Sequence, residues 1–248
     1  MNLDFNIFCK STTGAAQLPG CFGQGGETSY LQWLLSAWGW TAAVAVCGFV
    51  LAMAAGIAVG TLRTLPGRRG LAMLAIAWTE LFRNIPLLVQ IFVWYHVLPF
   101  FVPVLKALPG WLLAALALGL FTSARIAEQV RAALQALPRG QLQAAQALGM
   151  RTLQAYRLVL LPVALRQMIP TLTSEAMNSV KNSSVAFAVG IAELTQFALQ
   201  AQEETAHGIE FYLAVTLLYA VTALAVNRVL AMVESRTRLP GTVVAEAG

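Results

Sequence analysis

Five apolar stretches, separated by more polar connections, dominate the pattern of the chain. They cover residues 31–62, 71–98, 110–131, about 182–200 and about 210–232, and the fourth is the most polar of them. A helix of about 20 largely apolar residues is long enough to cross the hydrocarbon core of a bilayer. The pattern therefore predicts an all-α integral membrane protein with about five transmembrane helices.

Basic residues fall on alternate connections between these stretches, which predicts the orientation of the chain. Of the 16 basic residues, 12 lie on three connections, whereas the opposite side carries only Lys10 and Lys106. The 12 are Arg63, Arg68, Arg69, Arg131, Arg139, Arg151, Arg157, Arg166, Lys181, Arg228, Arg236 and Arg238. Lys and Arg are retained on the cytoplasmic side. We therefore expect the amino terminus to lie outside and the carboxyl terminus to lie in the cytoplasm.

Composition supports a membrane protein with one domain. Charged residues make up 11% of the chain and hydrophobic residues 58%, whereas a soluble domain usually has about 25% charged residues. The formal charge of +5 does not indicate nucleic-acid binding, because the basic residues form no single clustered face. We divide the chain into a periplasmic segment (1–30), a transmembrane domain (31–240) and a cytoplasmic tail (241–248). The first segment lacks the features of a cleavable signal peptide, so we expect it to be retained.

The connection between the third and fourth stretches is unusually long and contains its own short helix. Pro138, Arg139 and Gly140 should stop the third span, because proline lacks a backbone donor and glycine favours turns. Residues 141–148 are good helix formers, and Gly149 is placed to terminate them. The small side chains of this helix would let another protein approach closely. An amphipathic helix on the membrane surface is the alternative.

Residues 143–162, QAAQALGMRTLQAYRLVLLP, resemble the EAA loop of ABC-transporter importer permeases within a longer cytoplasmic loop, 138–166. The resemblance rests on Gln143, Ala144, Ala145, Gly149, Val159, Leu161 and Pro162. Gln143 stands where the family usually has Glu, so its side chain can hydrogen-bond but cannot form a salt bridge. Residues 80–99, 121–141, 178–184 and 235–241 also resemble the polar amino acid branch of these permeases, and in particular the glutamate/aspartate permease subunits.

This resemblance implies the fold of type I ABC importer permeases and a set of partners. The short helix would be a coupling helix that docks in a groove of a cytoplasmic ATP-binding subunit. Its coupling residues would be Gln143, Ala144, Ala145, Gln146, Gly149 and Met150. ATP and Mg would bind to that ATPase, and this chain would bind no cofactor. Two ATPase subunits, a second homologous permease (or a second copy) and a periplasmic amino-acid-binding protein would complete the complex in the bacterial inner membrane.

Polar residues within the second stretch are candidates for a substrate passage. Glu80 would lie about 14 Å deep in the bilayer, and Arg83 is close enough on the same face to pair with it. Charges at this depth are expensive and should face the protein interior or a watery cavity. Asn84 and Gln90 add polar groups, and Pro86 can open the helix. Arg83 could hold a substrate carboxylate; alternatively, the Glu80–Arg83 pair could lock two spans together.

Further passage candidates lie in the third stretch and at the inner entrance of the fourth. They are Thr122, Ser123, Glu175, Asn178, Asn182 and Ser183. For the last four, a gate and a scaffold are equally compatible with the sequence. Arg125, Glu128 and Arg131 form a ladder that we interpret as structural. Neither His96 nor His207 has metal-ligand neighbours in sequence, so no metal site is expected. Cys9 and Cys21 could form a disulfide in an oxidising periplasm or remain two free thiols.

Two other classes of function compete with an importer permease. A secondary transporter would show internal repeats with paired broken helices, and no such repeat is apparent. An intramembrane enzyme needs a nucleophile with a base in reach, and the chain has no Gly-x-Ser-x-Gly or His-Glu-x-x-His motif. The chain also lacks a G-x-x-x-x-G-K-[ST] phosphate loop, so any nucleotide must bind to a separate subunit.

Overall fold

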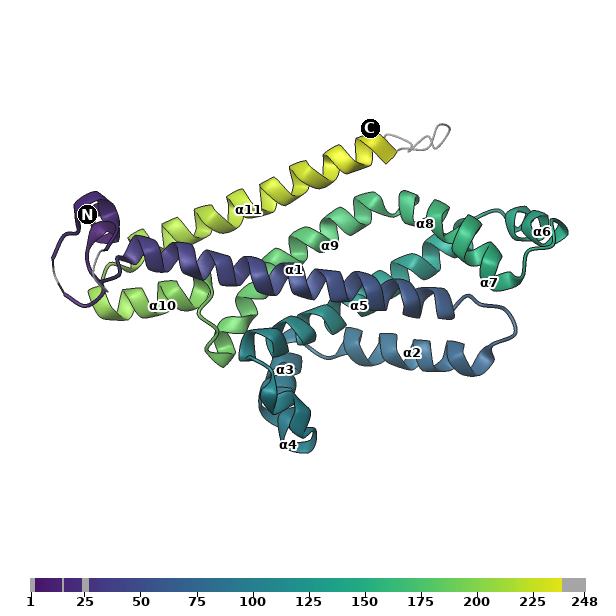
Figure 1. Ribbon diagram of the computed structural model, residues 1–248, viewed down its shortest axis with the longest axis horizontal. Helices are drawn as coiled ribbons and strands as arrows, with labels where there is room; N and C mark the ends of the chain where they lie inside the picture. Colours follow the sequence, from purple (N-terminus) through teal and green to yellow (C-terminus); the bar gives the residue numbers. More distant parts are fainter. Residues whose placement is uncertain (1–2, 15, 24–26, 238–248) are drawn as a thin grey trace. The chain divides into compact units, whose positions relative to one another are not determined.

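The protein is all-α, as the sequence predicts. The structure is a computed structural model that describes residues 3–14, 16–23 and 27–237 (Figure 1). Within these ranges the chain forms helices, turns and two isolated β-bridges, Lys10 with Gln17 and Ser11 with Ser29. The predicted tail, 241–248, lies outside the described residues.

Three helices are long and apolar enough to cross a membrane by themselves. They are α1 (Tyr30–Leu62), α5 (Gly110–Ala136) and α11 (Gly208–Thr237). These helices confirm the first, third and fifth predicted spans, with α5 extended by one turn and α11 by a few residues at each end. Two bent helix pairs raise the number of candidate spans in the described residues to five.

The second predicted span is sharply bent, whereas a single span was expected over residues 71–98. It consists of α2 (Arg69–Asn84), α3 (Leu87–Phe92), a π-helical turn η3 (Val93–Val97) and α4 (Leu98–Phe101). The two halves meet at 104°. The cause is Pro86, which disfavours helical backbone at the preceding residue. Ile85 accordingly adopts φ −94° and ψ 129°. A short 3₁₀ helix, η4 (Pro103–Ala107), follows.

The fourth predicted span, 182–200, has the wrong limits. The helix begins 13 residues earlier and is built from α9 (Ile169–Asn182), η6 (Ser183–Val189) and α10 (Leu194–Thr205). The two parts are bent by 49°. The break follows Gly190, whose φ of +74° ends the helix in the left-handed region. The side chain of Glu193 then accepts hydrogen bonds from the backbone N–H groups of Thr195 and Gln196 and so starts α10.

The chain forms two compact units, each assembled from three separate segments. Unit 1 comprises Met1–Gly48, Pro86–Leu118 and Ser179–Leu224, and unit 2 comprises Phe49–Ile85, Gly119–Asn178 and Ala225–Gly248.

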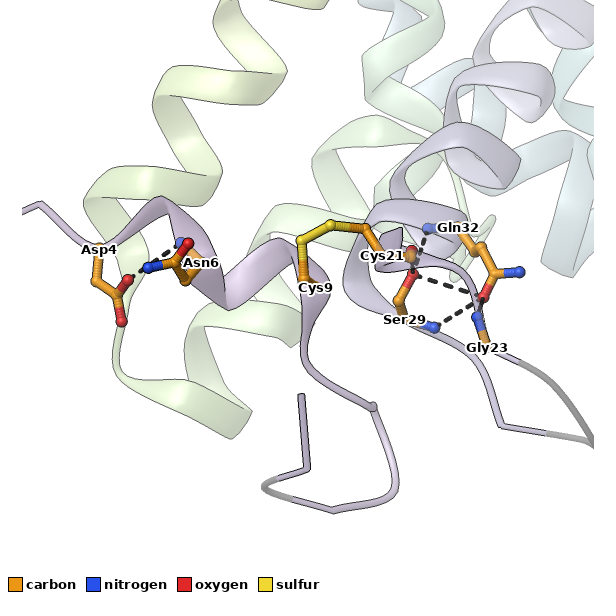
Figure 2. The surroundings of a disulfide bond; sticks show 7 residues. All are labelled: Asp4, Asn6, Cys9, Cys21, Gly23, Ser29 and Gln32. Carbon is orange, nitrogen blue, oxygen red and sulfur yellow. Dashed lines mark hydrogen bonds between the residues drawn. A yellow bond between two sulfur atoms is a disulfide. The ribbon is translucent and has the colours of Figure 1, made fainter. Parts of the chain in front are cut away.

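The amino-terminal segment packs onto helices of unit 1. It contains η1 (Phe5–Cys9) and η2 (Pro19–Cys21). Ile7 belongs to a buried apolar cluster with residues of α1, α10 and α11, and the Phe8 ring lies 5.1 Å from that of Phe211. A disulfide joins Cys9 to Cys21 (Figure 2), so the bridged alternative is the one observed. Beside it, the Ser29 hydroxyl donates to the Cys21 carbonyl at 2.7 Å.

Unit 2 is held together by close packing between α1 and α5. Its buried cluster contains Ala52, Ile126, Val130, Leu134, Leu137, Tyr156, Leu160, Ala164 and Met168. Gly60 permits the closest approach, because a Cβ there would lie 2.5 Å from the Ala127 carbonyl oxygen and 2.6 Å from the Val130 Cβ. Small residues at helix interfaces allow such backbone proximity in membrane proteins.

Candidate functional site

The predicted short helix of the long connection is present in unit 2 as α6 (Arg139–Ala147). It starts at Arg139, so Arg139 and Gly140 begin α6, and α5 ends before them at Ala136. Gly149 ends it, with a φ of +82°. The Gly149 N–H donates to the Gln146 carbonyl at 2.9 Å, and the Met150 N–H donates to the Ala145 carbonyl at 3.1 Å. This pair of bonds is a Schellman motif, which satisfies the last helical carbonyls and turns the chain away.

One face of α6 is exposed and the other is packed against unit 2. Gln143, Ala144, Gln146 and Ala147 are exposed, but the side chain of Ala145 is not, at 4% exposure. Ala145 lies on the same helical face as Leu142, which packs against the core cluster of unit 2. In this conformation the side chain of Ala145 therefore packs within unit 2, and its predicted role as a coupling residue would depend on its backbone.

An exposed leucine extends the outward face of α6. Leu148 caps the carboxyl end of the helix and is 80% exposed. Transfer of such a side chain out of water stabilises an interface by about 1.5–3 kcal/mol. The sequence analysis did not assign this residue, although its place immediately before the predicted terminator was a usable signal.

The rest of the EAA-like loop supports α6 from within unit 2. It forms α7 (Thr152–Ala155), a π-helical turn η5 (Tyr156–Leu160) and α8 (Leu161–Gln167), and α7 follows α6 directly (Figure 1). The buried Tyr156 hydroxyl donates to the Thr64 carbonyl at 2.7 Å, which ties this loop to the residues just after α1. Pro162 lies in the first turn of α8, directly after the π-helical turn η5.

Glu80, Arg83 and Asn84 form one polar group on α2, also in unit 2. The Arg83 Nη2 lies 3.4 Å from the Glu80 Oε1, and the Asn84 Nδ2 donates to the Glu80 Oε2 at 2.8 Å. The predicted ion pair is thus formed, but it lies within a single helix. Both partners lie on α2, and about half of each side chain is exposed.

This polar group faces away from the packed side of α2. The side chains of Glu80 and Arg83 are 51% and 46% exposed, whereas Ala75 and Thr79 of the same helix are buried. A charged pair directed at lipid would be expensive. The exposed face of α2 is therefore suited to a watery cavity or to another protein chain.

Other passage candidates of unit 2 are engaged inside the unit. Thr122 and Ser123 are buried, and the Ser123 hydroxyl donates to the Leu120 carbonyl and accepts from the Trp78 Nε1. The Glu175 side chain is 4% exposed, and its Oε1 accepts from the Arg125 Nε at 3.1 Å and the Gln129 Nε2 at 2.9 Å. Glu175 thus has the contacts of a scaffold residue in this conformation.

The remaining candidates lie near the junction of α9 and η6 or on α3. Asn178 and Asn182 are half-buried on the same face of α9, and Ser183 is buried with its hydroxyl donating to the Val180 carbonyl at 2.7 Å. Gln90 is buried on α3.

The predicted ladder of Arg125, Glu128 and Arg131 is only partly formed, because Arg125 pairs with a residue outside it. Glu128 is bound by Arg131, three residues away, and by the Arg63 Nη1 at 2.5 Å. Arg63 also donates to Thr79 at 3.2 Å, so one cation links the end of α1 to both α2 and α5. Arg125 pairs with Glu175 instead. In the sequence, Arg63 served only as one of the basic residues that predict the orientation of the chain, and its ion pair with Glu128 was not predicted.

A buried carboxylate in unit 1 was missed by the sequence analysis. Glu193 is fully buried, and besides capping α10 it accepts a hydrogen bond from the Tyr219 hydroxyl at 2.6 Å. The adjacent Leu194 N–H donates to the Thr41 hydroxyl of α1 at 3.1 Å. An acidic residue in the otherwise apolar stretch 185–194 was the available signal.

These features define a polytopic helical protein with a short helix in its long connection, and comparison with known families gives its class. Residues 48–239 match the family described as binding-protein-dependent transport system inner membrane component. The chain belongs to this family.

Individual relatives and solved structures agree with that assignment. The chain is 43% identical over 228 residues to the glutamate/aspartate import permease protein GltJ of Escherichia coli K12, covering 87% of this chain and 92% of that one. It is 33% identical to the probable amino-acid ABC transporter permease protein PatM of Vibrio harveyi, over 82% of this chain and 91% of the relative. A crystal structure of an amino acid ABC transporter with histidines superimposes with a TM-score of 0.72, at 28% identity over 84% and 95% of the two chains.

The class of function follows from the family and these relatives. The protein is a multi-pass membrane permease subunit of an ABC importer for polar amino acids, and it is not a secondary transporter. It is not itself an enzyme, because ATP hydrolysis takes place on a partner subunit. An ATP-binding subunit and a binding protein are its partners.

Proposed function

We propose that this permease subunit carries glutamate and aspartate inward by alternating access, driven by ATP hydrolysis on a separate subunit. The name of the Escherichia coli relative, a glutamate/aspartate import permease at 43% identity over most of both chains, supports this substrate class. Arg83 on α2 offers a cation to a substrate carboxylate. The observation that supports this mechanism is the exposed face of α6, because the other face of the same helix is packed.

The coupling surface consists of Gln143, Ala144, Gln146, Ala147 and Leu148, with Gly149 and Met150 fixing the end of the helix. The two alanines leave room for another backbone, and Leu148 supplies an apolar contact. An isolated helix of nine residues is unstable in water. Packing of Ala145 and Leu142 against unit 2 supplies the missing stability, so motion of the ATPase would be transmitted into this unit.

The substrate passage lies along the exposed face of α2. Glu80, which accepts a hydrogen bond from Asn84, pairs with Arg83 on the same helix, so the guanidinium is oriented while one side stays accessible. Asn178 of unit 2, and Asn182, Ser183 and Gln90 of unit 1, are further polar candidates for contact with the substrate. Thr122, Ser123 and Glu175 would contribute only in a conformation that frees their side chains.

The assembly has the amino terminus in the periplasm and the carboxyl terminus in the cytoplasm of a bacterial inner membrane. Two ATPase subunits bind ATP and Mg, and this chain binds no cofactor. A second permease, either a homologue or a second copy, closes the passage, because five spans are few for a complete pathway. A periplasmic binding protein delivers the amino acid to the outer face. The alternation of basic and non-basic connections supports this orientation.

Uptake into proteoliposomes tests the substrate and the role of Arg83. The purified complex with binding protein and internal ATP should accumulate labelled glutamate, and Arg83→Gln should cut the rate sharply while the complex still assembles. Arg69→Gln is the matched control, because Arg69 is an exposed arginine at the start of the same helix. Uptake that is equal in both variants would contradict a passage role for Arg83. Loss of assembly in Arg83→Gln would favour a structural role.

Site-specific crosslinking tests the coupling surface. Cys47 is exposed and should first be replaced by serine. Cysteines introduced at Ala144 or Gln146 should then crosslink to the ATPase, whereas a cysteine at the buried Ala145 should not. Crosslinks absent from all three positions in the assembled complex, together with normal import after deletion of α6, would overturn the coupling role.

A further inference from the structure

A polar cavity lies in unit 1 between the amino-terminal segment and the loop that precedes α11. Its volume is about 480 Å³, within the range of sites for small molecules. Its polar lining includes Lys10, Ser11, Thr13, Tyr30, Glu204 and His207. None of the passage residues named above contributes to it.

The cavity presents one cation and one anion to a ligand. The Lys10 Nζ forms a long ion pair with the Asp4 Oδ2, at 3.9 Å and beyond hydrogen-bond distance, so its ammonium can still donate hydrogen bonds to a carboxylate. Glu204 accepts a hydrogen bond from the Tyr30 hydroxyl at 2.9 Å through Oε2, and within the described chain its Oε1 has no hydrogen bond. His207 is held by Glu210, with 3.5 Å between Nδ1 and Oε1, which leaves Lys10 as the available cation.

Hydroxyl groups surround the cationic end of the cavity. The Ser11 and Thr13 hydroxyl oxygens lie 3.0 Å apart, so one donates to the other and the second keeps a proton for a ligand. An arrangement of ammonium plus hydroxyl donors suits a carboxylate, whereas a free carboxylate oxygen suits an ammonium group. The lining thus offers a partner of opposite charge to each of the two groups of an amino acid zwitterion.

The backbone that carries Lys10 is fixed on several sides. The disulfide holds the preceding residue, Cys9, and the Tyr30 N–H donates to the Lys10 carbonyl at 3.2 Å. The Thr12 N–H donates to the Thr28 carbonyl at 2.9 Å. Such a preformed site loses little conformational entropy when it binds a ligand. The disulfide thus constrains the residue next to Lys10 as well as linking the segment.

We propose that this cavity is a binding site for free amino acids at the outer face of the permease, separate from the passage on α2. The α-carboxylate would bind to Lys10 and the Ser11–Thr13 hydroxyls, and the α-ammonium to Glu204. The proposal rests on the proposed orientation, which places the amino-terminal segment outside. It adds a low-selectivity site that holds an amino acid between its release by the binding protein and its passage through the membrane.

Equilibrium binding to the complete permease–ATPase complex in lipid nanodiscs, without the binding protein, tests the proposal. Labelled glutamate is the probe, and an Arg83→Gln background removes the contribution of the passage. Saturable binding should persist in that background, and Lys10→Gln or Glu204→Gln should each weaken it about tenfold or more. Lys10→Arg should retain it. Lys106→Gln is the matched control, because Lys106 is the other basic residue of the outer side and does not line the cavity.

Competition distinguishes recognition of a zwitterion from simple charge attraction. Glutamine should compete with glutamate, because both carry the same head group, and N-acetylglutamate should not, because its nitrogen is no longer an ammonium. A non-reducing mobility assay should show that the disulfide persists in each variant, which separates loss of the site from loss of the fold.

Two outcomes would overturn the site without affecting the proposed function. One is loss of all glutamate binding in Arg83→Gln alone, and the other is an identical Kd for Lys10→Gln and Lys106→Gln. If Lys10→Gln instead weakens only the affinity for the binding protein, the cavity is a docking surface and the amino-acid site is refuted. Failure of the wild-type complex to import glutamate with ATP and binding protein would contradict the proposed function itself.

Discussion

Replacement of Gly149 should weaken coupling through a purely conformational effect. Its φ of +82° places it in the left-handed region, and a Cβ built there would meet no heavy atom within 4 Å. Steric overlap with neighbouring groups therefore adds nothing to the free-energy cost of the substitution. The penalty for an ordinary side chain in this region is about 1–2 kcal/mol, which corresponds to a roughly five- to thirtyfold loss in the population of the observed α6 terminus.

A graded series gives this prediction its sharpest form. Asn tolerates the left-handed region, so Gly149→Asn should stay close to wild type, Gly149→Ala should be weaker, and the β-branched Gly149→Val should be the weakest. Gly140→Ala is the matched control. Gly140 lies inside α6, has no positive φ and also has open space around its Cβ position. Alanine there should be neutral or should stabilise α6 by about 0.5–1 kcal/mol.

The assay is ATP-dependent uptake, together with binding-protein-stimulated ATPase activity of the reconstituted complex. Hydrogen exchange at the Gly149 and Met150 amides reports directly on the two bonds that close the helix. Exchange should accelerate in the same order in which uptake falls. Equal uptake for the Asn, Ala and Val variants, with unchanged exchange, would refute the link between this turn and coupling.

Two further predictions concern the packing of unit 2. Gly60→Leu should prevent a stable complex from forming, because a Cβ alone would lie 2.5 Å from the Ala127 carbonyl oxygen. Yield and thermal stability in detergent measure this effect. The control variant Gly39→Leu should be tolerated, because the space around Gly39 is open. Arg125→Met should destabilise the protein by about 2 kcal/mol, because it leaves the buried Glu175 without its ion-pair partner. The double variant Arg125→Met/Glu175→Gln should recover most of that loss in thermal stability, and a double variant no more stable than Arg125→Met would argue against the pair.

The long apolar spans could be predicted from the sequence because hydropathy over a window reports membrane burial directly. The stretch 31–62 corresponds to α1 within one residue. The short helix α6 and its stop at Gly149 could also be predicted, because helix propensity and glycine termination are local properties. Local signals of this kind do not depend on what the segment packs against.

Tertiary context decided what the sequence analysis missed. The start of α9 at Ile169 was invisible to hydropathy, because Thr173, Glu175 and Ser179 are polar and yet buried. Their burial depends on partners elsewhere, such as Arg125 on α5. The orientation of Ala145 likewise depends on where Leu142 meets the core of unit 2. Pro86 indicated a possible break, but proline alone does not set an angle of 104°.

The buried carboxylate of Glu193 has a mechanical consequence for transport. Its carboxylate accepts hydrogen bonds from the first turn of α10 and from the Tyr219 hydroxyl of α11. The Thr41 hydroxyl of α1 accepts a hydrogen bond from the next backbone N–H, that of Leu194. Separating any of these helices would strand a polar group in a dry interior, which is unfavourable by about 1–3 kcal/mol for each group left unpaired. Within unit 1 these three helix segments should consequently move as one rigid body during each transport cycle. Bending should occur where no such hydrogen bonds join the helices.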